Sequence, residues 1–246
     1  MLRCSLLALC CALLLLAAGD GHASSRLPAK YGKAPYNQMS LSIGAPNKGS
    51  QLRAKRLRKK PFLHIKKNSR ANVYGHPALV NMIYRTARDI KRSARGSVLL
   101  VGDLSNKSGG PLPKHRSHQS GRDADIAFYA TTAKGKRVEL DHFVAFKGSG
   151  EAKDGSGLVF DDWRNWLLVQ SWLRDRRAGI SHIFVSSPLR ARLLRFARKD
   201  KRYRKYADEA AKLLKRPQDS SAHDDHFHVR ISCPKRQGDI CREESL

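Results

Sequence analysis

Helices are predicted where apolar residues recur every three to four positions along the chain. The clearest case follows Pro77, where Leu79, Ile83 and Ile90 fall on one face of a helix. Three further segments show helical spacing, the first rich in tryptophan and the other two rich in Arg and Lys. These segments are residues 161–174, 189–199 and 206–214.

Strands are predicted where short apolar or alternating runs lie between turn signals. Such runs cover residues 97–102, 123–130, 137–143, 180–185 and 226–232. The helices and strands do not alternate regularly along the chain. We therefore expect an α+β fold with a small central antiparallel sheet and flanking helices.

Two of these strands have one polar and one apolar face, because alternate residues of a strand point to the same side. In the first strand, Asp123 and Asp125 share a face, and the residues between and after them are apolar. In the second, His226, His228 and Arg230 share a face, again with apolar residues between them. Each strand thus combines a core face with a face that carries candidate metal ligands.

The candidate ligands belong to two histidine clusters, in residues 115–125 and 223–228. If the two strands are neighbours, a metal ion can lie between His228 and Asp125, with His118 on the third side. Imidazole nitrogens and carboxylate oxygens are zinc ligands, and three protein ligands with a water in the fourth position describe a catalytic zinc site. We therefore expect a zinc site with hydrolytic chemistry on the polar face of the sheet.

The remaining polar residues of the clusters have several candidate roles. His223 and His226 are left free to transfer a proton or to stabilise negative charge on a tetrahedral oxygen. Asp123 either orients a ligating histidine or lies solvated beside the site. His115 is open between an orienting role, a substrate contact and a further metal ligand. Isolated histidines are expected to be packed or hydrogen-bonded, and these are His64, His76, His142 and His182.

Two other kinds of metal site use similar ligands. Non-haem iron oxygenases also bind their metal with two histidines and a carboxylate, but with closer spacing than that of His118 and Asp125. A purely structural zinc site would favour cysteine ligands, and the cysteines outside the N-terminal segment lie in the C-terminal tail. A catalytic zinc site is the preferred interpretation.

The N-terminus has the pattern of a secretory signal peptide. Arg3 precedes an apolar run from Cys4 to Ala18, and small residues lead to an expected cleavage site after Ala23. The apolar run is shorter than the roughly 20 residues that a membrane span needs. We therefore expect export with removal of residues 1–23, and no transmembrane segment afterwards. A retained anchor helix is the alternative.

Cysteine usage and charge agree with export. After cleavage, Cys233 and Cys241 remain, and in an oxidising compartment they are expected to form a disulfide. The chain carries a formal net charge of +27, and the expected signal peptide contains one basic and one acidic residue, so the charge is kept. Such a charge favours polyanions, which for an exported protein are anionic envelope polymers and not nucleic acid. A basic surface that serves solubility is the alternative.

The chain divides into three regions. Residues 1–23 are the expected signal peptide, residues 24–70 an irregular basic N-terminal arm, and residues 71–246 one catalytic domain. Within the arm, residues 51–70 mix Lys and Arg with isolated apolar residues. This mixture is compatible with a basic segment laid on an anionic surface or with a disordered tether.

The two histidine clusters combine into a specific pattern, H-x6-D followed by H-x-x-H-x-H. Its flanks include Tyr74-Gly75-His76-Pro77, Gly102-Asp103, Gly109-Gly110, Ile183-Phe184-Val185 and Cys233-Pro234. With these flanks, residues 74–241 resemble the penicillin-insensitive murein endopeptidases. This family belongs to a wider group of metallopeptidases with the D-Ala-D-Ala carboxypeptidases, the lysostaphin-type enzymes and the hedgehog signalling domain.

The resemblance implies roles for the cluster residues. It makes His118, Asp125 and His228 the ligands of a catalytic zinc, and it gives His223 and His226 the tasks of orienting water and stabilising the transition state. It implies a small α+β fold with a central antiparallel sheet. The implied substrate is the D-alanyl to meso-diaminopimelyl cross-link between peptidoglycan stem peptides. Because the implied nucleophile is a water and not a serine, β-lactams would not trap the enzyme.

The chain departs from the family at the residues of a second zinc site, its tail is shorter than in longer relatives and keeps only the Cys233–Cys241 pair, and the basic segment 51–70 is not part of the resemblance. Some members bind a second zinc through the equivalent of His115 and a D-x-x-H pair, but the matching stretch here reads Asp154-Gly155-Ser156-Gly157. The histidine of that pair is missing, so the resemblance does not carry a second zinc to this chain.

The sequence thus predicts an exported zinc endopeptidase that acts on peptidoglycan stem peptides in the periplasm. Two alternatives remain. One is a D,D- or L,D-carboxypeptidase that uses the same zinc site on a terminal residue. The other is a non-catalytic protein that binds cell-wall or other polyanions. The oligomeric state is not predicted.

Overall fold

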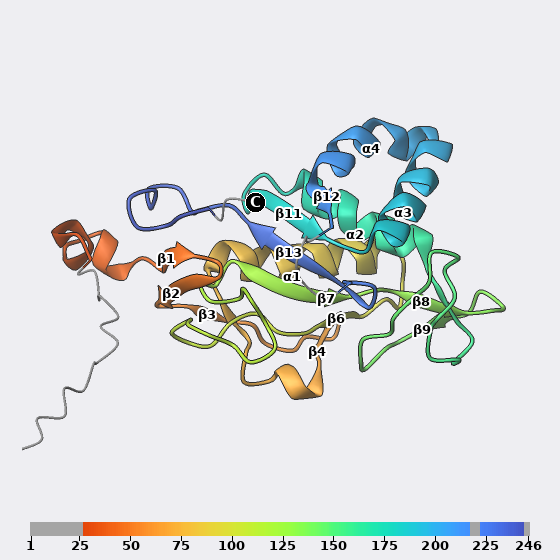
Figure 1. Cartoon of the computed structure of the whole chain (residues 1–246), viewed down its shortest axis with the longest axis horizontal. Helices are drawn as coiled ribbons and strands as arrows, with labels where there is room; N and C mark the ends of the chain where they lie inside the picture. Colours follow the sequence, from red (N-terminus) through yellow and green to blue (C-terminus); the bar gives the residue numbers. More distant parts are fainter. Residues whose placement is uncertain (1–26, 217–221, 244–246) are drawn as a thin grey trace, which may run out of the picture.

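The computed structural model describes residues 27–216 and 222–243. In these ranges the chain has a mixed α+β fold (Figure 1). The expected signal peptide lies outside the described residues. Within those ranges, none of the helices combines the length and apolar character that a membrane crossing requires.

The helices lie close to their predicted positions. The four α-helices of the described chain are α1 (Pro77–Ser93), α2 (Asp162–Arg174), α3 (Ser187–Lys199) and α4 (Lys201–Leu213). Short 3-10 helices are η1 (Ala29–Gly32), η2 (Tyr36–Gln38) and η3 (Lys67–Ser69). Helix α1 begins where expected because Pro77 occupies its first position and the His76 ring accepts a hydrogen bond from the Ala78 amide at 3.2 Å.

The strands of the described chain form one six-stranded sheet and three smaller sheets. In spatial order, the six-stranded sheet contains β12 (Leu214–Lys215), β11 (Ile180–Phe184), β13 (His226–Ile231), β7 (Asp123–Ala127), β6 (Leu99–Val101) and β4 (Leu63–Ile65). The smaller sheets pair β1 (Leu41–Ala45) with β2 (Lys48–Leu52), β3 (Lys55–Arg56) with β5 (Tyr74–Gly75), and β8 (Ala130–Thr132) with β9 (Arg137–Val138) and β10 (Leu158–Phe160). The strand expected over 137–143 is therefore limited to β9.

The six-stranded sheet is antiparallel at its centre and parallel at its two edges. Strands β11, β13, β7 and β6 pair antiparallel, as predicted, whereas β12 runs parallel to β11 and β4 runs parallel to β6. Parallel neighbours need a crossover connection. Helix α1 lies between β4 and β6 in the chain, and α3 and α4 lie between β11 and β12. These crossovers make the sheet mixed and not purely antiparallel.

Much of the segment expected to be an irregular arm over 24–70 is folded. It contains β1 to β4, and β4 is an edge strand of the six-stranded sheet. Leu57 and Leu63 are only 1% and 0% exposed and belong to the main core. The local pattern looks irregular because the hydrogen-bond partner of β4 is β6, which lies more than thirty residues away in the chain.

The C-terminal tail packs against the same N-terminal segment. The predicted disulfide joins Cys233 and Cys241, with an S–S distance of 2.08 Å. The Gly44 amide of β1 donates a hydrogen bond to the Ile240 carbonyl at 2.7 Å. Leu41 and Ile240 are buried together in a small second core. The two ends of the described chain therefore stabilise each other.

Helices α1 and α2 cover one face of the sheet. Phe227 of β13 packs against Trp172 of α2, with ring centroids 5.4 Å apart, and both belong to the core that also contains Ile83 of α1. In Figure 1, α1 passes behind β7 and β13. Because side chains alternate along a strand, the histidines of β13 point to the opposite face. The fold thus leaves that face available for a site.

Candidate metal centre

Strands β13 and β7 are direct neighbours, which was the condition for a shared metal site. They pair antiparallel, and their register places His228 opposite Asp125 and Arg230 opposite Asp123. A one-residue shift would send all these side chains to the other face of the sheet. The register therefore brings the polar faces of the two strands together.

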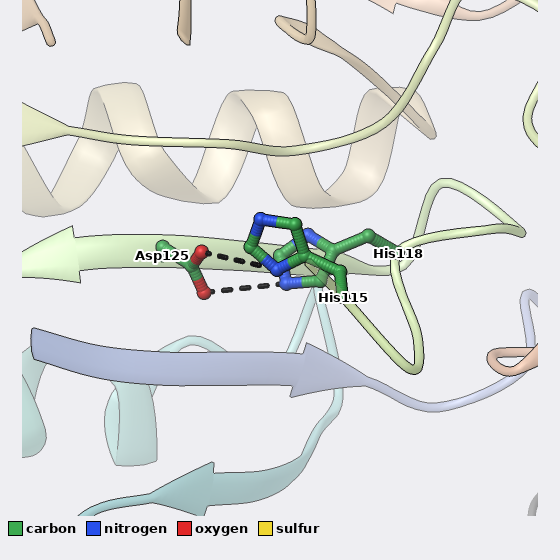
Figure 2. Close-up of side chains that lie close together, drawn as sticks. All are labelled: His115, His118 and Asp125. Atoms are coloured by element: carbon green, nitrogen blue, oxygen red, sulfur yellow. Dashed lines mark ion pairs between the residues drawn. The ribbon is translucent and has the colours of Figure 1, made fainter. Parts of the chain in front are cut away.

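Three histidine nitrogens converge on one oxygen of Asp125. From Asp125 Oδ1, His118 Nε2 lies at 3.2 Å, His226 Nε2 at 3.4 Å and His228 Nδ1 at 3.7 Å. The other oxygen, Oδ2, lies 3.8 Å from His115 Nδ1. Figure 2 shows His115 and His118 directed at the Asp125 carboxylate from the loop before β7. Asp125 is thus the centre of the cluster.

Within this cluster, His115, His118 and Asp125 form a group that could hold a metal ion. Each offers one ligand atom, and these atoms lie within 4.8 Å of one another. His118 Nε2 and Asp125 Oδ1 are buried and have no hydrogen-bond partner. Buried polar atoms are normally paired, so two unpaired ligand atoms side by side fit a bound cation. The donor set of imidazole and carboxylate is one that zinc accepts.

The backbone before β7 is bent to aim His118 at the cluster. His118 has a φ of +69°, and Gly121 has a φ of +72°. This φ favours glycine, and a Cβ on Gly121 would also lie 1.9 Å from Gln51 Oε1, so a larger residue would displace the Gln51 side chain. The His118 Nδ1 atom lies 2.5 Å from the Leu104 carbonyl and donates to it, which leaves Nε2 as the free ligand atom. The loop therefore fixes both the place and the tautomer of this ring.

His228 is oriented by Asp123. Its Nε2 donates to Asp123 Oδ1 at 2.7 Å, and Arg230 Nε donates to the same oxygen at 2.6 Å. Burial alone would raise the pKa of Asp123, but Arg230 and His228 hold it far below its ordinary value. The carboxylate therefore stays ionised and leaves His228 Nδ1 facing Asp125. A ligating histidine held by a carboxylate through its other nitrogen is common in zinc sites.

His226 and His228 are neighbours in opposite electrostatic states. Burial opposes the charged form of His226, but Asp125 and Asp225 outweigh it and raise its pKa to about 10. Burial is the main reason that the pKa of His228 falls to about 3. The His223 ring lies beside both, with centroids 5.0 Å from His226 and 5.5 Å from His228. Neighbouring groups with pKa values pushed apart are typical of acid–base sites.

The sequence profile of the penicillin-insensitive murein endopeptidases matches residues 42–245. The chain belongs to this family. The match includes both histidine clusters and most of the segment that was expected to lie outside the catalytic domain.

Individual relatives are distant but cover most of the chain. A penicillin-insensitive murein endopeptidase of Klebsiella pneumoniae subsp. pneumoniae is 27% identical over 202 residues, which cover 81% of this chain and 69% of the relative. That of Pectobacterium atrosepticum is 28% identical over 175 residues, covering 70% and 57%. One from Escherichia coli is 26% identical over 171 residues, covering 69% and 58%. The chain thus spans little more than half the length of two of these relatives.

Sequence reasoning missed three residues that contact the clusters. Asp103 lies 3.2 Å from His115 Nε2, and Asp225 lies 2.6 Å from His226 Nδ1. Asp103 belongs to the family flank Gly102-Asp103 and Asp225 lies within the second histidine cluster, so their positions were a usable signal. Phe143 stacks on His226, with centroids 4.9 Å apart and an angle of 22° between the rings. Nothing in the local pattern around Phe143 indicated this contact.

The isolated histidines are packed or hydrogen-bonded, as predicted. The His76 ring caps α1. The other three have nearby polar partners: His64 with Glu139 at 2.8 Å, His142 with Asp141 at 2.6 Å and His182 with Ser181 at 3.1 Å.

The stretch in place of the D-x-x-H pair forms an exposed turn. Asp154 Oδ1 accepts a hydrogen bond from the Ser156 amide at 2.9 Å. Asp154 is not among the three residues that form the possible metal group. Its carboxylate stabilises its own turn.

Proposed function

We propose that the protein is an exported zinc metallo-endopeptidase that hydrolyses D-alanyl to meso-diaminopimelyl cross-links of peptidoglycan in the periplasm. The observation that carries the proposal is the convergence of His118, His226 and His228 on Asp125 Oδ1. Membership of the murein endopeptidase family supports the substrate class. The positively charged chain is suited to an anionic envelope.

His118, Asp125 and His228 are the zinc ligands in this proposal. His118 Nε2 and His228 Nδ1 both face Asp125 Oδ1. The other nitrogen of each ring is hydrogen-bonded elsewhere, to the Leu104 carbonyl and to Asp123. His115 lies on the Oδ2 side, with its second nitrogen near Asp103. It therefore borders the site and, without a partner from the D-x-x-H stretch, does not complete a second one.

The other two histidines handle protons and charge. Zinc in such a site activates a water and polarises the scissile carbonyl. Asp225 accepts from His226 Nδ1, so His226 Nε2 is held toward Asp125 and can keep or pass a proton there. His223 lies beside His226 and His228, where it can stabilise negative charge on the reacting oxygen. The proposed nucleophile is a water and not a serine, so the enzyme should be insensitive to penicillin.

Zinc binding tests the ligand assignment. The exported protein, purified without chelator, should carry about one zinc per chain by elemental analysis. His228→Ala should lose that zinc, whereas His115→Ala and the exposed control His142→Ala should keep it. Circular dichroism shows whether each variant is folded. A folded wild-type protein that binds no zinc at neutral pH would contradict the mechanism, and loss of zinc in His115→Ala alone would contradict the ligand set.

Digestion of purified muropeptide dimers tests the reaction. The protein should convert dimers to monomers in the presence of penicillin, and a chelator should stop it. Mass spectrometry of the products separates the alternatives. Loss of one terminal alanine from an intact dimer would show a carboxypeptidase, and an unchanged dimer with zinc-loaded protein would show a non-catalytic wall-binding protein.

A further inference from the structure

An arginine-lined cleft lies between α1 and α2, away from the metal centre. Its volume is about 550 Å³, within the usual range for ligand pockets. The two helices cover the apolar face of the sheet, and α1 lies behind β7 and β13 in Figure 1. The candidate metal ligands of β7 and β13 point to the opposite, polar face, because side chains alternate along a strand. The cleft is therefore a separate surface. We call it the arginine cleft and define it by Arg85, Arg92, Arg174, Arg176 and Arg177.

Two of these arginines are already paired. Arg85 binds Asp175 through two contacts, Nε to Oδ2 at 2.7 Å and Nη2 to Oδ1 at 3.0 Å. Arg92 pairs with Asp89, which also lines the cleft. These contacts satisfy both acidic residues of the lining. They also hold two guanidinium groups in place at its wall.

The other three arginines leave an excess of positive charge. Arg174, Arg176 and Arg177 are exposed, and their side chains form no ion pair with any described residue. They come from the end of α2 and the turn that follows it, whereas Arg85 and Arg92 come from α1. Guanidinium groups thus approach the cleft from both helices. A carboxylate typically pairs with one guanidinium group through its two oxygens, whereas the tetrahedral arrangement of the oxygens of a phosphate group lets several guanidinium groups contact it.

We propose that the arginine cleft binds a phosphate group of an envelope component. The net charge of +27 attracts polyanions from a distance, and the cleft provides a defined place for one of them to bind. Because the cleft lies behind the sheet, a protein bound there keeps its metal centre open to solvent and substrate. The phosphate can belong to a lipid headgroup or to a phosphorylated glycan, since the recognising chemistry is the same. This inference rests on the proposed export to the envelope but not on the peptidase activity.

The test compares two triple variants that lose the same charge. The first is Arg174→Gln/Arg176→Gln/Arg177→Gln. The control, on α3 and α4, is Arg195→Gln/Lys199→Gln/Lys212→Gln, whose side chains are likewise without an ion pair in the described structure. Binding of inorganic pyrophosphate is measured by calorimetry, with citrate as a carboxylate comparison. We expect at least about tenfold weaker pyrophosphate binding in the cleft variant and less than about twofold in the control.

The outcomes are distinct. Equally weakened pyrophosphate binding in both variants would show that general surface charge binds phosphate. Equal affinity of the wild-type protein for citrate and pyrophosphate would rule out phosphate recognition. Either result overturns the proposal. Vesicles of phosphatidylglycerol identify the source. Loss of vesicle binding in the cleft variant assigns the lipid headgroup, and retained vesicle binding assigns a phosphate that is not in a lipid. Zinc content and muropeptide digestion should be unchanged in the cleft variant.

Discussion

Gly102 is the position where adding one methyl group should disturb the metal centre most directly. Its amide donates to the Asp125 carbonyl at 2.8 Å, and the Phe143 ring lies where a Cβ on Gly102 would point. A Cβ on Gly102 would lie 2.5 Å from Phe143 Cζ and 3.1 Å from Cε2. Phe143 in turn stacks on His226. Gly102→Ala should therefore displace Phe143 and remove the packing of His226.

The size of the effect follows from this contact distance. Carbon atoms in contact prefer about 3.5–4.0 Å, so the Phe143 ring must move by about 1 Å or more. Overpacking of this kind costs about 1–3 kcal/mol. Alanine also lowers the conformational entropy of the unfolded chain, which stabilises the folded protein by about 0.4–1 kcal/mol and offsets part of this cost. We expect Gly102→Ala to lower the free energy of unfolding by about 1–2 kcal/mol, or the Tm by about 2–8 °C.

A double-mutant cycle measured by urea denaturation tests the reasoning. Gly102→Ala, Phe143→Ala and the double variant are compared, with Gly238→Ala as control because nothing lies within 4 Å of a Cβ there. Once the ring is removed, the new methyl group has space, so the two costs should be less than additive. Muropeptide digestion should be slower in Gly102→Ala. If Gly102→Ala costs the same with and without the Phe143 ring, the steric argument is refuted.

Three further substitutions test buried polar groups and the tail. Asp123→Asn removes the negative charge that pairs with Arg230 in the core, and should lower the free energy of unfolding by about 3–5 kcal/mol in urea denaturation, and zinc affinity by about 10–100-fold in a chelator competition. Burial lowers the pKa of His76 from 6.5 to about 4 in the folded protein. As the pH falls, this histidine is therefore protonated in the unfolded chain before it is protonated in the folded one. The free energy of unfolding should decrease as the pH falls from 6.5 toward 4. His76→Asn keeps a capping acceptor and should reduce this loss in urea denaturation of chelated protein at several pH values, whereas the exposed control His142→Asn should not. Cys233→Ser opens the disulfide and should cost about 2–3 kcal/mol in urea denaturation without reductant.

Each of these expectations has a clear opposite. Unchanged zinc affinity in Asp123→Asn would show that this carboxylate does not orient a zinc ligand. An unaltered pH dependence in His76→Asn would show that the His76 ring is protonated equally in the folded and unfolded chain. A Cys233→Ser variant as stable as the wild type would show that the tail is held by its packing alone.

The sequence by itself determined the features that depend on the residue spacing along a single helix or strand. Spacing of three to four residues located α1 to α4 within a few positions, and alternation put Asp123 and Asp125 on one face of β7. The same alternation separated His226 and His228 from the core face of β13. The two histidine clusters, together with their flanking residues, also indicated the family. These features are local, because side-chain direction follows directly from helix or strand geometry.

Tertiary structure decided everything that depends on partners far away in the chain. It paired β13 with β7 so that three histidines meet Asp125, placed β4 in the sheet, and laid Phe143 over Gly102 and His226. It also gathered the arginine cleft from two helices that lie some seventy residues apart. A local pattern states which face of an element is polar, but the neighbour of that face is selected by the packing of the whole core, where register and burial are satisfied together.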